Sequence, residues 1–510
     1  MPGGLPRAGL RAWLIAACGC LPLAGVAQTA PARHSLVIRN VTVVDTHDGT
    51  LHPGRAVVIE AGRILRIEAE AEATAAPPIG ASSVDGSGKF LVPGLLDMHT
   101  HALPLLMQGQ SPWPMLLAHG VTGIREMAGS LTLTRLARQI NVERAAGLAL
   151  APEILQVPGE IVFGVTSAAL ARRMVLEQKA MGADFIKVVS ADRDAALAIV
   201  DAARQHGLQV AGHLPPSLPT LEAIQAGWHA IEHLGAGIGM LLDCARDASA
   251  IRRAIADGQG ASPGLNPLAI VSPLLFRAAD APLVQRVIDS HDEGRCEALA
   301  AASARGGTWH VPTLIRLRTM AFSTDETYHR QADLDSVDKT RRALWEQLAR
   351  QYAHSVPPAA AATFRRYYTL QQRLAQVLQQ QGVRLMAGSD LGGIWLLPGA
   401  SLHQELIELE AAGLTPLQVL QAATLNGALF LQREAMMGSV DEGKQADLLL
   451  LDANPLLSAA NLGRIDAVIM QGVYHPRSEL DAWRRARRRS VAATPLRDVA
   501  TVLDRAHVHR

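Results

Sequence analysis

The stretch LVPGLLDMHTH, residues 91–101, decides how the rest of the chain is interpreted. Its apolar run, entered through Pro93 and Gly94, predicts a buried strand that ends in two histidines with one residue between them. Side chains two apart on a strand share a face, so His99 and His101 can both offer a ring nitrogen to one cation. Neutral imidazole is a common zinc ligand, and the alternative is a pair of surface histidines at a strand end. Further candidate ligands at the ends of other strands would favour a metal site over a pair of surface histidines.

The composition is typical of a large folded protein without a pronounced charge. A chain of 510 residues can build a large core, and we expect one large domain and a smaller one. Hydrophobic residues make up 49% of the chain and charged residues 19%, which excludes a disordered protein. The net charge of +1 gives no reason to expect a nucleic-acid partner. The oligomeric state stays open, a homo-oligomer included.

The N-terminus is typical of a secretory signal peptide, residues 1–27. Arg7 and Arg11 form a positive flank, and an apolar run that ends in small residues follows them. The run is too short to cross a membrane, so we expect a periplasmic or secreted protein without a stable membrane span after processing. A lipoprotein anchor at Cys18 is the less favoured alternative, because too little apolar sequence precedes it.

Two of the four cysteines, Cys244 and Cys296, remain after removal of the signal peptide. An exported protein meets an oxidising compartment, so we expect these two residues to form a disulfide. The alternative is two separate buried thiols, because a sequence does not show whether two sulfur atoms approach each other.

Short β-type runs occur near both ends of the chain. Between turn residues, such runs fill residues 35–92 and predict the first part of a small β-sandwich. Strand character returns at residues 446–451 and 467–470, so residues 430–476 are predicted to complete that domain. Residues 477–510 form a basic helical tail, for which a solvated helix face is expected and contact with an anionic surface is the alternative.

Strands alternate with helices in the middle of the chain. Over residues 93–429 this alternation predicts an α/β fold, a (β/α)₈ TIM barrel. A helical insertion, residues 235–307, separates the sixth and seventh strands, and a second helical stretch, residues 324–380, follows the seventh. The expected strands are residues 95–101, 121–126, 154–157, 185–189, 209–213, 230–234, 308–314 and 384–390.

Residues able to bind a metal or a proton recur at the ends of five of these strands. Functional residues of a TIM barrel cluster at the carboxyl ends of its strands. Lys187 is unusual, because burying an ammonium group costs several kcal/mol unless the group is paired, deprotonated or modified. A salt-bridged lysine at a strand end is the alternative. The six candidates are His99, His101, Lys187, His213, His233 and Asp390.

With their surrounding motifs, these residues resemble the amidohydrolase superfamily of metal-dependent hydrolases. The segments LNGA at residues 425–428 and GKQADL at residues 443–448 resemble the return of that family into its sheet domain. The segments that resemble its first, fourth, fifth, sixth and eighth strand signatures are PGLLDMHTH (93–101), FIK (185–187), GH (212–213), EH (232–233) and GSD (388–390).

The resemblance implies two divalent metal ions, expected to be zinc, bridged by a carbamate on Lys187. Asp390 would also shuttle a proton while a metal-bridging hydroxide attacks the metal-polarised carbonyl of a small amide substrate. One metal would be held by His99, His101 and Asp390, and the other by His213 and His233.

Within the superfamily, Lys187 and the Gly-His-Leu-Pro segment that contains His213 resemble secreted dipeptidase-like members, which cleave dipeptides or N-acyl amino acids. Deaminase-like members often carry a glutamate three residues after this histidine, where this chain has Pro216. Residues 158–164 replace the usual Gly-Gly-His loop and put the usual substrate-carboxylate contact in doubt. A mononuclear deaminase, a cyclic-amide hydrolase and a non-catalytic metal-binding interaction protein remain alternatives, the last disfavoured by a buried lysine and a base.

Other polar residues are weaker candidates. Arg125 closes the second strand and His310 lies on the seventh, and both are predicted substrate contacts, with a packed histidine as the alternative for His310. Asp97 is predicted to be a structural partner behind the histidine ligands. His119 and His229 lie near strand starts, the end of a barrel that contributes stability, so no chemistry is expected of them.

Overall fold

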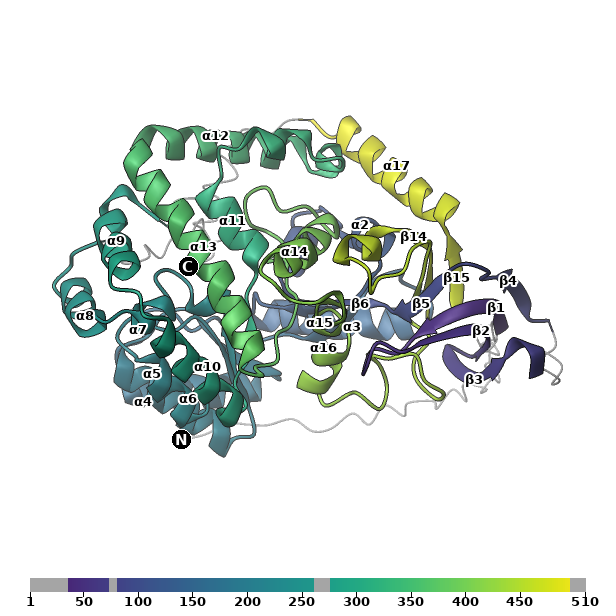
Figure 1. Cartoon of the computed structure of the whole chain (residues 1–510), viewed down its shortest axis with the longest axis horizontal. Helices are drawn as coiled ribbons and strands as arrows, with labels where there is room; N and C mark the ends of the chain where they lie inside the picture. The colour runs from purple at the N-terminus through teal and green to yellow at the C-terminus, as the bar shows by residue number, and fades with distance from the viewer. Residues whose placement is uncertain (1–34, 73–79, 261–275, 496–510) are drawn as a thin grey trace, which may run out of the picture. The chain divides into compact units, whose positions relative to one another are not determined.

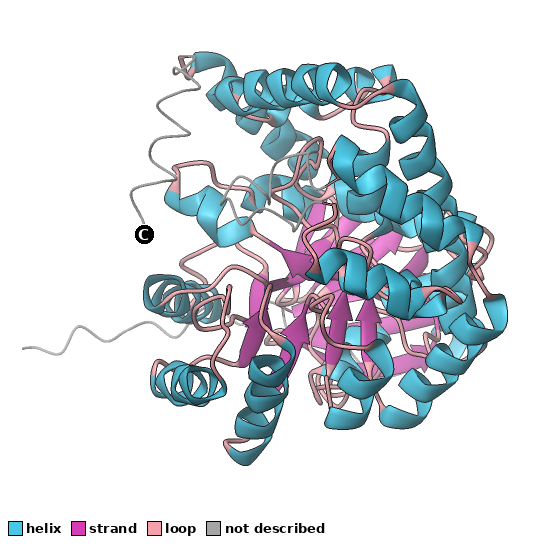
Figure 2. Cartoon of the chain, turned by 90° about the vertical axis from the view of Figure 1, so that its left-hand side faces the viewer, coloured by secondary structure: helices cyan, strands magenta, loops and turns pink. Residues whose placement is uncertain are grey.

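The computed structural model of the chain describes residues 35–72, 80–260 and 276–495 (Figure 1). The predicted signal peptide and the lipoprotein cysteine lie outside the described residues, as do parts of the insertion and of the basic tail. Within the described residues the fold is mixed α/β, with helices around the strands (Figure 2).

One eight-stranded sheet contains strands from both ends of the chain, in the order β15-β14-β13-β5-β1-β2-β3, with β4 paired to β1. The two ends meet where β13 pairs antiparallel with β5, Leu449 lying opposite Val92. The strand character predicted near the C-terminus is therefore present, whereas the sandwich and the domain boundaries stay predictions. The strands are β1 (Ser35–Val44), β2 (Leu51–Glu60), β3 (Arg63–Ala69), β4 (Ser82–Asp85), β5 (Phe90–Pro93), β13 (Leu448–Leu451), β14 (Ile465–Met470) and β15 (Val473–Pro476).

Residues 91–101 contribute to two strands, and the second of them begins at Leu95, where the sequence predicts the first strand of the barrel. β5 belongs to the eight-stranded sheet, and β6 (Leu95–Thr100) belongs to a different, parallel sheet. Gly94 joins them and donates its N–H to the Asp447 carbonyl at 2.8 Å. A Cβ at Gly94 would lie 2.2 Å from Oγ1 of Thr122, so only glycine fits this crossing. The close packing at this change of sheet depends on these tertiary contacts.

Two parallel sheets carry most of the strands expected in the middle of the chain. One has the order β6-β7-β8 and the other the order β12-β11-β10-β9. Each of the first seven predicted segments overlaps one of these strands, although several strands are shorter than predicted. The strands are β6 with β7 (Val121–Glu126), β8 (Glu153–Gln156), β9 (Phe185–Val188), β10 (Gln209–Gly212), β11 (Ala230–Glu232) and β12 (Trp309–Val311).

The eighth predicted strand, residues 384–390, is not a regular strand in the structure. The segment is held by single parallel bridges on its two sides. Leu385 pairs with His310 of β12, and Leu391 pairs with Thr100 of β6. The segment therefore lies between the last strand of one parallel sheet and the first strand of the other.

The other flanks of the two parallel sheets are also connected. The Asp184 N–H, just before β9, donates to the carbonyl of Val157, just after β8, at 3.0 Å. Further along, Val162 forms a parallel bridge with Val188. Hydrogen bonds thus connect the two parallel sheets at both pairs of edges.

Helices follow most of the parallel strands and fill both long excursions. Among the described residues, no helix combines the length and the apolar character needed to cross a membrane. The helices of three or more turns are α3 (Leu131–Ala145), α4 (Ala168–Ala180), α5 (Arg193–Gln205), α10 (Glu293–Gly306), α12 (Lys339–Ser355), α13 (Pro358–Gln380), α14 (Ala400–Ala411) and α17 (Arg477–Ala493). The shorter ones are α1 (Ala102–Met107), α2 (Trp113–Ala118), α6 (Thr220–Ala226), α7 (Leu241–Cys244), α8 (Ala248–Ala256), α9 (Ala281–Asp289), α11 (Leu314–Ala321), α15 (Pro416–Ala422) and α16 (Leu425–Phe430).

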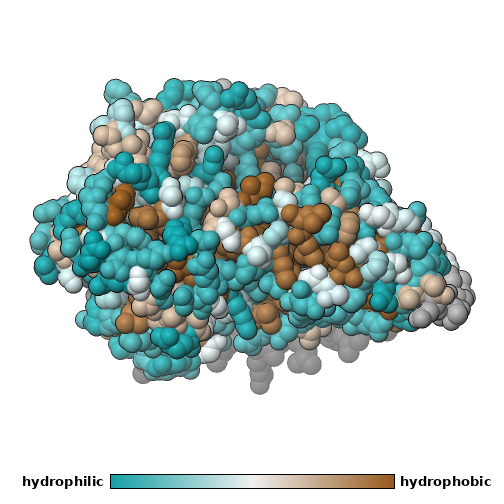
Figure 3. Space-filling model, viewed as in Figure 1, coloured by the Kyte–Doolittle hydropathy of each residue, from teal (hydrophilic) through white to brown (hydrophobic). Residues whose placement is uncertain are grey.

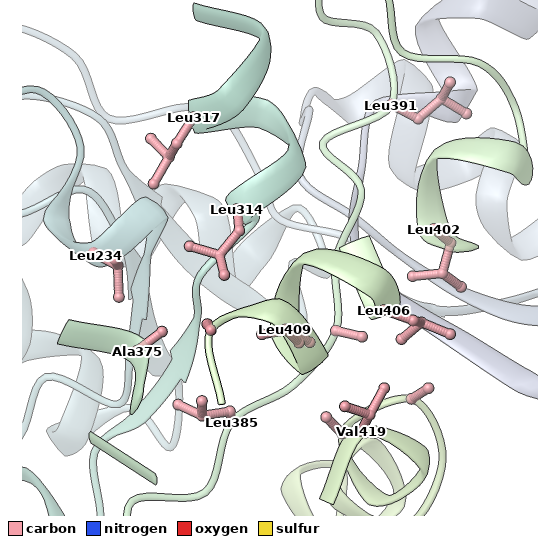
Figure 4. Close-up of a cluster of buried hydrophobic side chains, with 14 of the residues drawn as sticks. Leu234, Leu314, Leu317, Ala375, Leu385, Leu391, Leu402, Leu406, Leu409 and Val419 are labelled. Atoms are coloured by element: carbon pink, nitrogen blue, oxygen red, sulfur yellow. The ribbon is translucent and has the colours of Figure 1, made fainter. Parts of the chain in front are cut away.

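Buried leucines fix the segment that replaces the eighth strand (Figure 4). Leu385 and Leu391, near its two ends, belong to the same buried cluster as Leu314 of α11 and Leu406 of α14. Burying one leucine side chain contributes about 1.5–3 kcal/mol. The cluster can therefore hold the segment in place where regular strand pairing is missing.

On the outside of the protein, hydrophilic residues cover most of the face seen in Figure 3.

The basic run of the tail is only partly solvated. In α17, Arg488 forms ion pairs with Asp333 and Asp335, both at 2.9 Å. Arg484 of the same helix donates to the Ala118 carbonyl at 2.5 Å. Part of the predicted solvated face therefore binds the rest of the protein, because α17 packs along α2 and the short helix at Leu334–Ser336.

Cys244 at the end of α7 and Cys296 in α10 are joined by a disulfide across a sequence separation of 52 residues. Closing a loop of this length stabilises the fold by about 4 kcal/mol in the chain-entropy treatment.

We expect the Cys244→Ser/Cys296→Ser variant to lose about 2–4 kcal/mol of unfolding free energy in urea titrations. Intact mass should rise by about 2 Da on reduction of the wild type. An unchanged urea midpoint together with an unchanged mass would contradict the bond.

Candidate metal centre

The structure brings predicted ligands from both parallel sheets to one place. His99, His233 and Asp390 are buried, and each offers a ligand atom within 4.8 Å of the others. Oδ1 of Asp390 lies 3.1 Å from Nε2 of His101 and 3.4 Å from Nε2 of His99. The ring centroid of His213 lies 5.1 Å from that of His233. Five of the six candidates therefore converge, although they are scattered over almost 300 positions of the sequence.

The sixth candidate, Lys187, is buried in β9 beside this cluster. It pairs across the sheet with Ala211 of β10, two residues before His213. Among the described residues, its Nζ has no hydrogen-bond partner. Burial lowers the pKa of Lys187 to about 8, although the negative charges of Glu232 and Asp390 oppose the shift. The amine is therefore more easily deprotonated than an exposed lysine.

The backbone at the centre adopts unusual angles. Asp390 has a φ of 53° and His233 a φ of 54°, in the left-handed region that residues other than glycine rarely occupy. Such angles cost about 1–3 kcal/mol each and cluster at functional sites. The N–H of Asp390 donates to the His99 carbonyl at 2.8 Å, so the strained residue is held against β6. The backbone angle of Asp390 and its hydrogen bond to His99 thus direct the Asp390 carboxylate towards the histidines.

A buried ion pair lies behind His99. Oε2 of Glu232 accepts from Nδ1 of His99 at 2.7 Å, and Arg125 donates to Oε1 of Glu232. The Arg125 guanidinium lies 5.4 Å from the Phe185 ring centroid and 5.0 Å from that of Phe430. Burial alone would raise the pKa of Glu232, but the charges of Arg125 and His99 lower it to about 2. The Glu232 carboxylate therefore fixes Nδ1 of His99 and leaves Nε2 for the centre.

Asp97 holds the Asp390 segment against β6. Its carboxylate accepts from the N–H of Ser389 at 2.9 Å, from the Ser389 hydroxyl at 2.5 Å and from the N–H of His99 at 3.3 Å. Burial raises the pKa of Asp97 to about 7. The residue is a structural partner behind the ligands, the role that the sequence predicts.

The two predicted substrate contacts, His310 and Arg125, are both fully buried. His310 points to the outer side of β12, where Nε2 lies 3.3 Å from the Ser303 hydroxyl of α10. Its neighbours Trp309 and Val311 pack in the interior instead, as alternation along a strand requires. Burial lowers the pKa of His310 to about 3. Arg125 is engaged with Glu232, and a contact of either residue with a substrate stays a prediction.

Two further residues of the centre were not predicted from the sequence. Nε of Arg316, in α11, lies 3.2 Å from Oδ2 of Asp390. Gly393 leaves room for this side chain, since a Cβ there would lie 3.0 Å from Nη1 of Arg316. Glu232 stands directly before a predicted ligand in the motif EH, a signal that could have identified it. Arg316 carries no such signal, because it lies in an ordinary helix.

The arrangement fits divalent metal ions. Buried polar atoms without a partner are rare in folded proteins. Burial also lowers the pKa of His213 and His233 well below the usual histidine value, which keeps both rings in the neutral form that binds metals. Among the described residues, the buried atoms of candidate ligands without a hydrogen-bond partner include His99 Nε2, His101 Nδ1, Lys187 Nζ and Asp390 Oδ1.

Comparison with known proteins supports the resemblance to amidohydrolases. Residues 369–474 match the sequence model of the amidohydrolase family. The adenine deaminase of Desulforamulus reducens is 28% identical over 193 residues, 35% of this chain and 31% of the relative. The imidazolonepropionase of Treponema denticola is 37% identical over 84 residues, 16% of this chain and 19% of the relative. The chain thus spans a minor part of the length of the curated relatives it matches.

Solved structures agree over most of the chain. Bottromycin amidohydrolase superposes with a TM-score of 0.67 at 23% identity, covering 90% of this chain and 91% of that one. A Xaa-Pro dipeptidase with bound methionine gives a TM-score of 0.57 at 16% identity, covering 87% of this chain and all of that one, 100%. At these identities the likeness is one of fold. The match of residues 369–474 to the amidohydrolase family model supports the resemblance to that superfamily.

The buried pair of Arg125 and Glu232 gives a prediction about stability. Arg125→Met leaves the Glu232 charge buried without compensation, so we expect a loss of about 3–5 kcal/mol of unfolding free energy. Arg125→Met/Glu232→Gln should lose clearly less than the sum of the two single variants, because neither charge remains. Urea titrations of all four proteins measure this coupling.

The matched control is Arg204→Met, which removes a surface ion pair with Asp201. This variant should change stability by less than about 1 kcal/mol. Additivity of the two core substitutions within about 0.5 kcal/mol would contradict the coupling.

Proposed function

We propose that the chain is a metal-dependent hydrolase that cleaves a C–N amide bond of a small substrate, such as a dipeptide or an N-acyl amino acid. The observation that carries the proposal is the buried convergence of His99, His233 and Asp390 around one point. The amidohydrolase match and the dipeptidase and amidohydrolase folds among the solved neighbours support it. No nucleic acid is proposed as a partner.

The proposed architecture is a (β/α)₈ barrel with a small β-sandwich built from both ends of the chain. The connections between the two parallel sheets support the barrel. On one side, Asp184 donates to Val157, and on the other, the Met98 N–H donates to the Ala387 carbonyl at 2.9 Å. In a barrel of this kind the carboxyl ends of all strands face one pole, where functional residues collect.

Two divalent metal ions, expected to be zinc, would be held at the centre. When bound, they acidify a water molecule and polarise the carbonyl of the amide. The neutral amine of Lys187 can add to carbon dioxide, and the resulting carbamate would offer two anionic oxygens where the lysine offers none. The proposed ligands are His99, His101 and Asp390 for one metal, His213 and His233 for the other, and the carbamate on Lys187 between them.

Asp390 is the proposed proton carrier. Its carboxylate accepts a proton from the attacking water and delivers it to the leaving nitrogen. Burial by itself would raise the pKa of Asp390, but the charges of His233 and His99 hold that pKa well below its usual range. The carboxylate is therefore an anion at neutral pH. Arg316 contacts Oδ2 of this carboxylate while Oδ1 faces the histidines. The two oxygens therefore keep different partners.

Deamination or cyclic-amide hydrolysis is the second candidate. The curated relatives reported above are an adenine deaminase and an imidazolonepropionase, which favours these reactions. Against deamination, Pro216 stands where deaminase-like members often carry a glutamate. The metal count separates the candidates, because a mononuclear deaminase would hold one ion per chain.

Export to the periplasm or the medium is proposed for the location. The sequence of residues 1–27 supports it, and so does the disulfide between Cys244 and Cys296, since such bonds persist in oxidising compartments.

The proposed bridge gives a prediction about metal content. We expect Lys187→Ala to lose at least one of the two metal ions measured by plasma mass spectrometry, because a methyl group cannot form a carbamate. Lys179→Ala, on the exposed side of α4, is the matched control and should keep the wild-type content. Full occupancy in Lys187→Ala would refute the bridge.

The proposed proton carrier gives a prediction about turnover. We expect the metal-loaded wild type to release amino acids from a panel of dipeptides and N-acyl amino acids, and Asp390→Asn to be slower by about 10²–10⁴-fold. Ammonia release from adenine, measured in parallel, tests the second candidate. Turnover of adenine with no cleavage in the panel would replace the proposed function.

A further inference from the structure

Thr313 contacts the ring of His233 at the carboxyl ends of two neighbouring strands. β11 and β12 pair in parallel, with Glu232 opposite Val311. His233 follows Glu232 directly, and Thr313 follows Val311 by two residues. The strand register therefore brings the two side chains together, and Oγ1 of Thr313 lies 2.5 Å from Nδ1 of His233. Both side chains are buried, so water does not compete for this contact.

The direction of this hydrogen bond follows from the second partner of the hydroxyl. A hydroxyl has one proton to donate and two lone pairs that accept. Thr313 donates its proton to the Pro312 carbonyl at 2.8 Å, so it accepts from His233 and Nδ1 carries the proton. A neutral imidazole holds one proton, and the hydrogen bond of one ring nitrogen fixes the state of the other. Nε2 of His233 is therefore left unprotonated for the cluster with His99 and Asp390.

The start of α11 holds the Thr313 hydroxyl in place. Thr313 has a φ of 46° and a ψ of 49°, angles that are rare for a β-branched residue. Its carbonyl accepts from the N–H of Arg316 at 2.9 Å. The next turn is anchored from α14, where the fully buried Glu405 accepts from the N–H of Ile315 at 2.7 Å. Contacts within α11 and with α14 thus maintain the unusual angles that direct the hydroxyl to His233.

The same turn of α11 also contacts the other half of the proposed centre. Nε of Arg316 lies 3.2 Å from Oδ2 of Asp390. Asp390 is a proposed ligand of one metal ion, and His233 is a proposed ligand of the other. One helical turn, fixed by Glu405, therefore touches a ligand of each ion.

We propose that Thr313 is a positioning residue, whose hydroxyl accepts the Nδ1 proton of His233 and so presents Nε2 to the metal. The inference rests on the proposed function, because it concerns a ligand of the proposed metal pair. Glu232 fixes Nδ1 of His99 with a charged group, and Thr313 fixes Nδ1 of His233 with a neutral one. Without the hydroxyl, the proton could move to Nε2 and compete with the metal.

Metal affinity tests the proposal independently of turnover. Zinc binding by the full-length protein is measured by competition with a chelating dye. Thr313→Val keeps the shape of the side chain but removes the hydroxyl, and we expect at least one zinc ion to bind about 10–100-fold more weakly. Thr313→Ser keeps the hydroxyl and should bind zinc within about threefold of the wild type.

The matched control is Thr319→Val. This variant removes another fully buried hydroxyl of the same helix, one that donates to the Arg316 carbonyl at 2.8 Å instead of contacting a histidine. It should bind zinc as the wild type does. Thermal melting checks that each variant is folded.

The position of the proton is measured by NMR of the full-length protein without added metal, with isotope-labelled histidine. His233→Asn identifies the His233 signals by their loss. We expect the proton on Nδ1 in the wild type and in Thr313→Ser. In Thr313→Val the proton should lie at least partly on Nε2.

Three results would overturn the proposal. The first is wild-type zinc affinity in Thr313→Val. The second is a His233 proton on Nε2 in the wild type, which decides the matter even if Thr313→Val does not fold. The third is an equal loss of affinity in Thr313→Val and Thr319→Val, which would indicate a packing defect. A wild type that binds no zinc would contradict the proposed function, whereas the proton position would still decide this inference.

Discussion

The contact between the Asp390 segment and β6 is the constraint on which the candidate centre depends. The segment contains no regular strand, yet its N–H groups and carbonyls bond to β6 and β12. Asp97 adds two hydrogen bonds to Ser389, and the leucine cluster buries Leu385 and Leu391 on either side. These contacts bring the Asp390 carboxylate within reach of His99, although the two residues are far apart in sequence.

Many ionisable groups are buried together at the centre, and this burial shifts their pKa values. Burial alone would neutralise most of them, and mutual pairing decides which stay charged. Glu232 remains an anion because Arg125 is buried beside it, whereas Lys187 has no such direct partner and its pKa falls. As a result, the His213 and His233 rings are neutral while Glu232 and Asp390 are ionised, which are the protonation states that cation binding requires.

Helix α17 shows how the helix period divides a basic run. Arg484 and Arg488 bind the protein surface, Nε of Arg487 donates to the Ser336 carbonyl, and Arg485 is exposed. A run that is uniform in the sequence therefore contains both anchoring and solvated residues.

The sequence by itself determined seven of the parallel strands and the six candidate ligands, because hydrophobic period and strand-end motifs are local. The cysteines were expected to pair, but only the structure shows that the two sulfur atoms meet. The sequence could not show which residues pack around Gly94 between β5 and β6, since that packing depends on contact with Thr122. Nor could it show that His310 faces outward or that Arg316 reaches Asp390. Only the tertiary structure decided these points, because the direction of a side chain and the partner of a buried charge depend on segments distant in the chain.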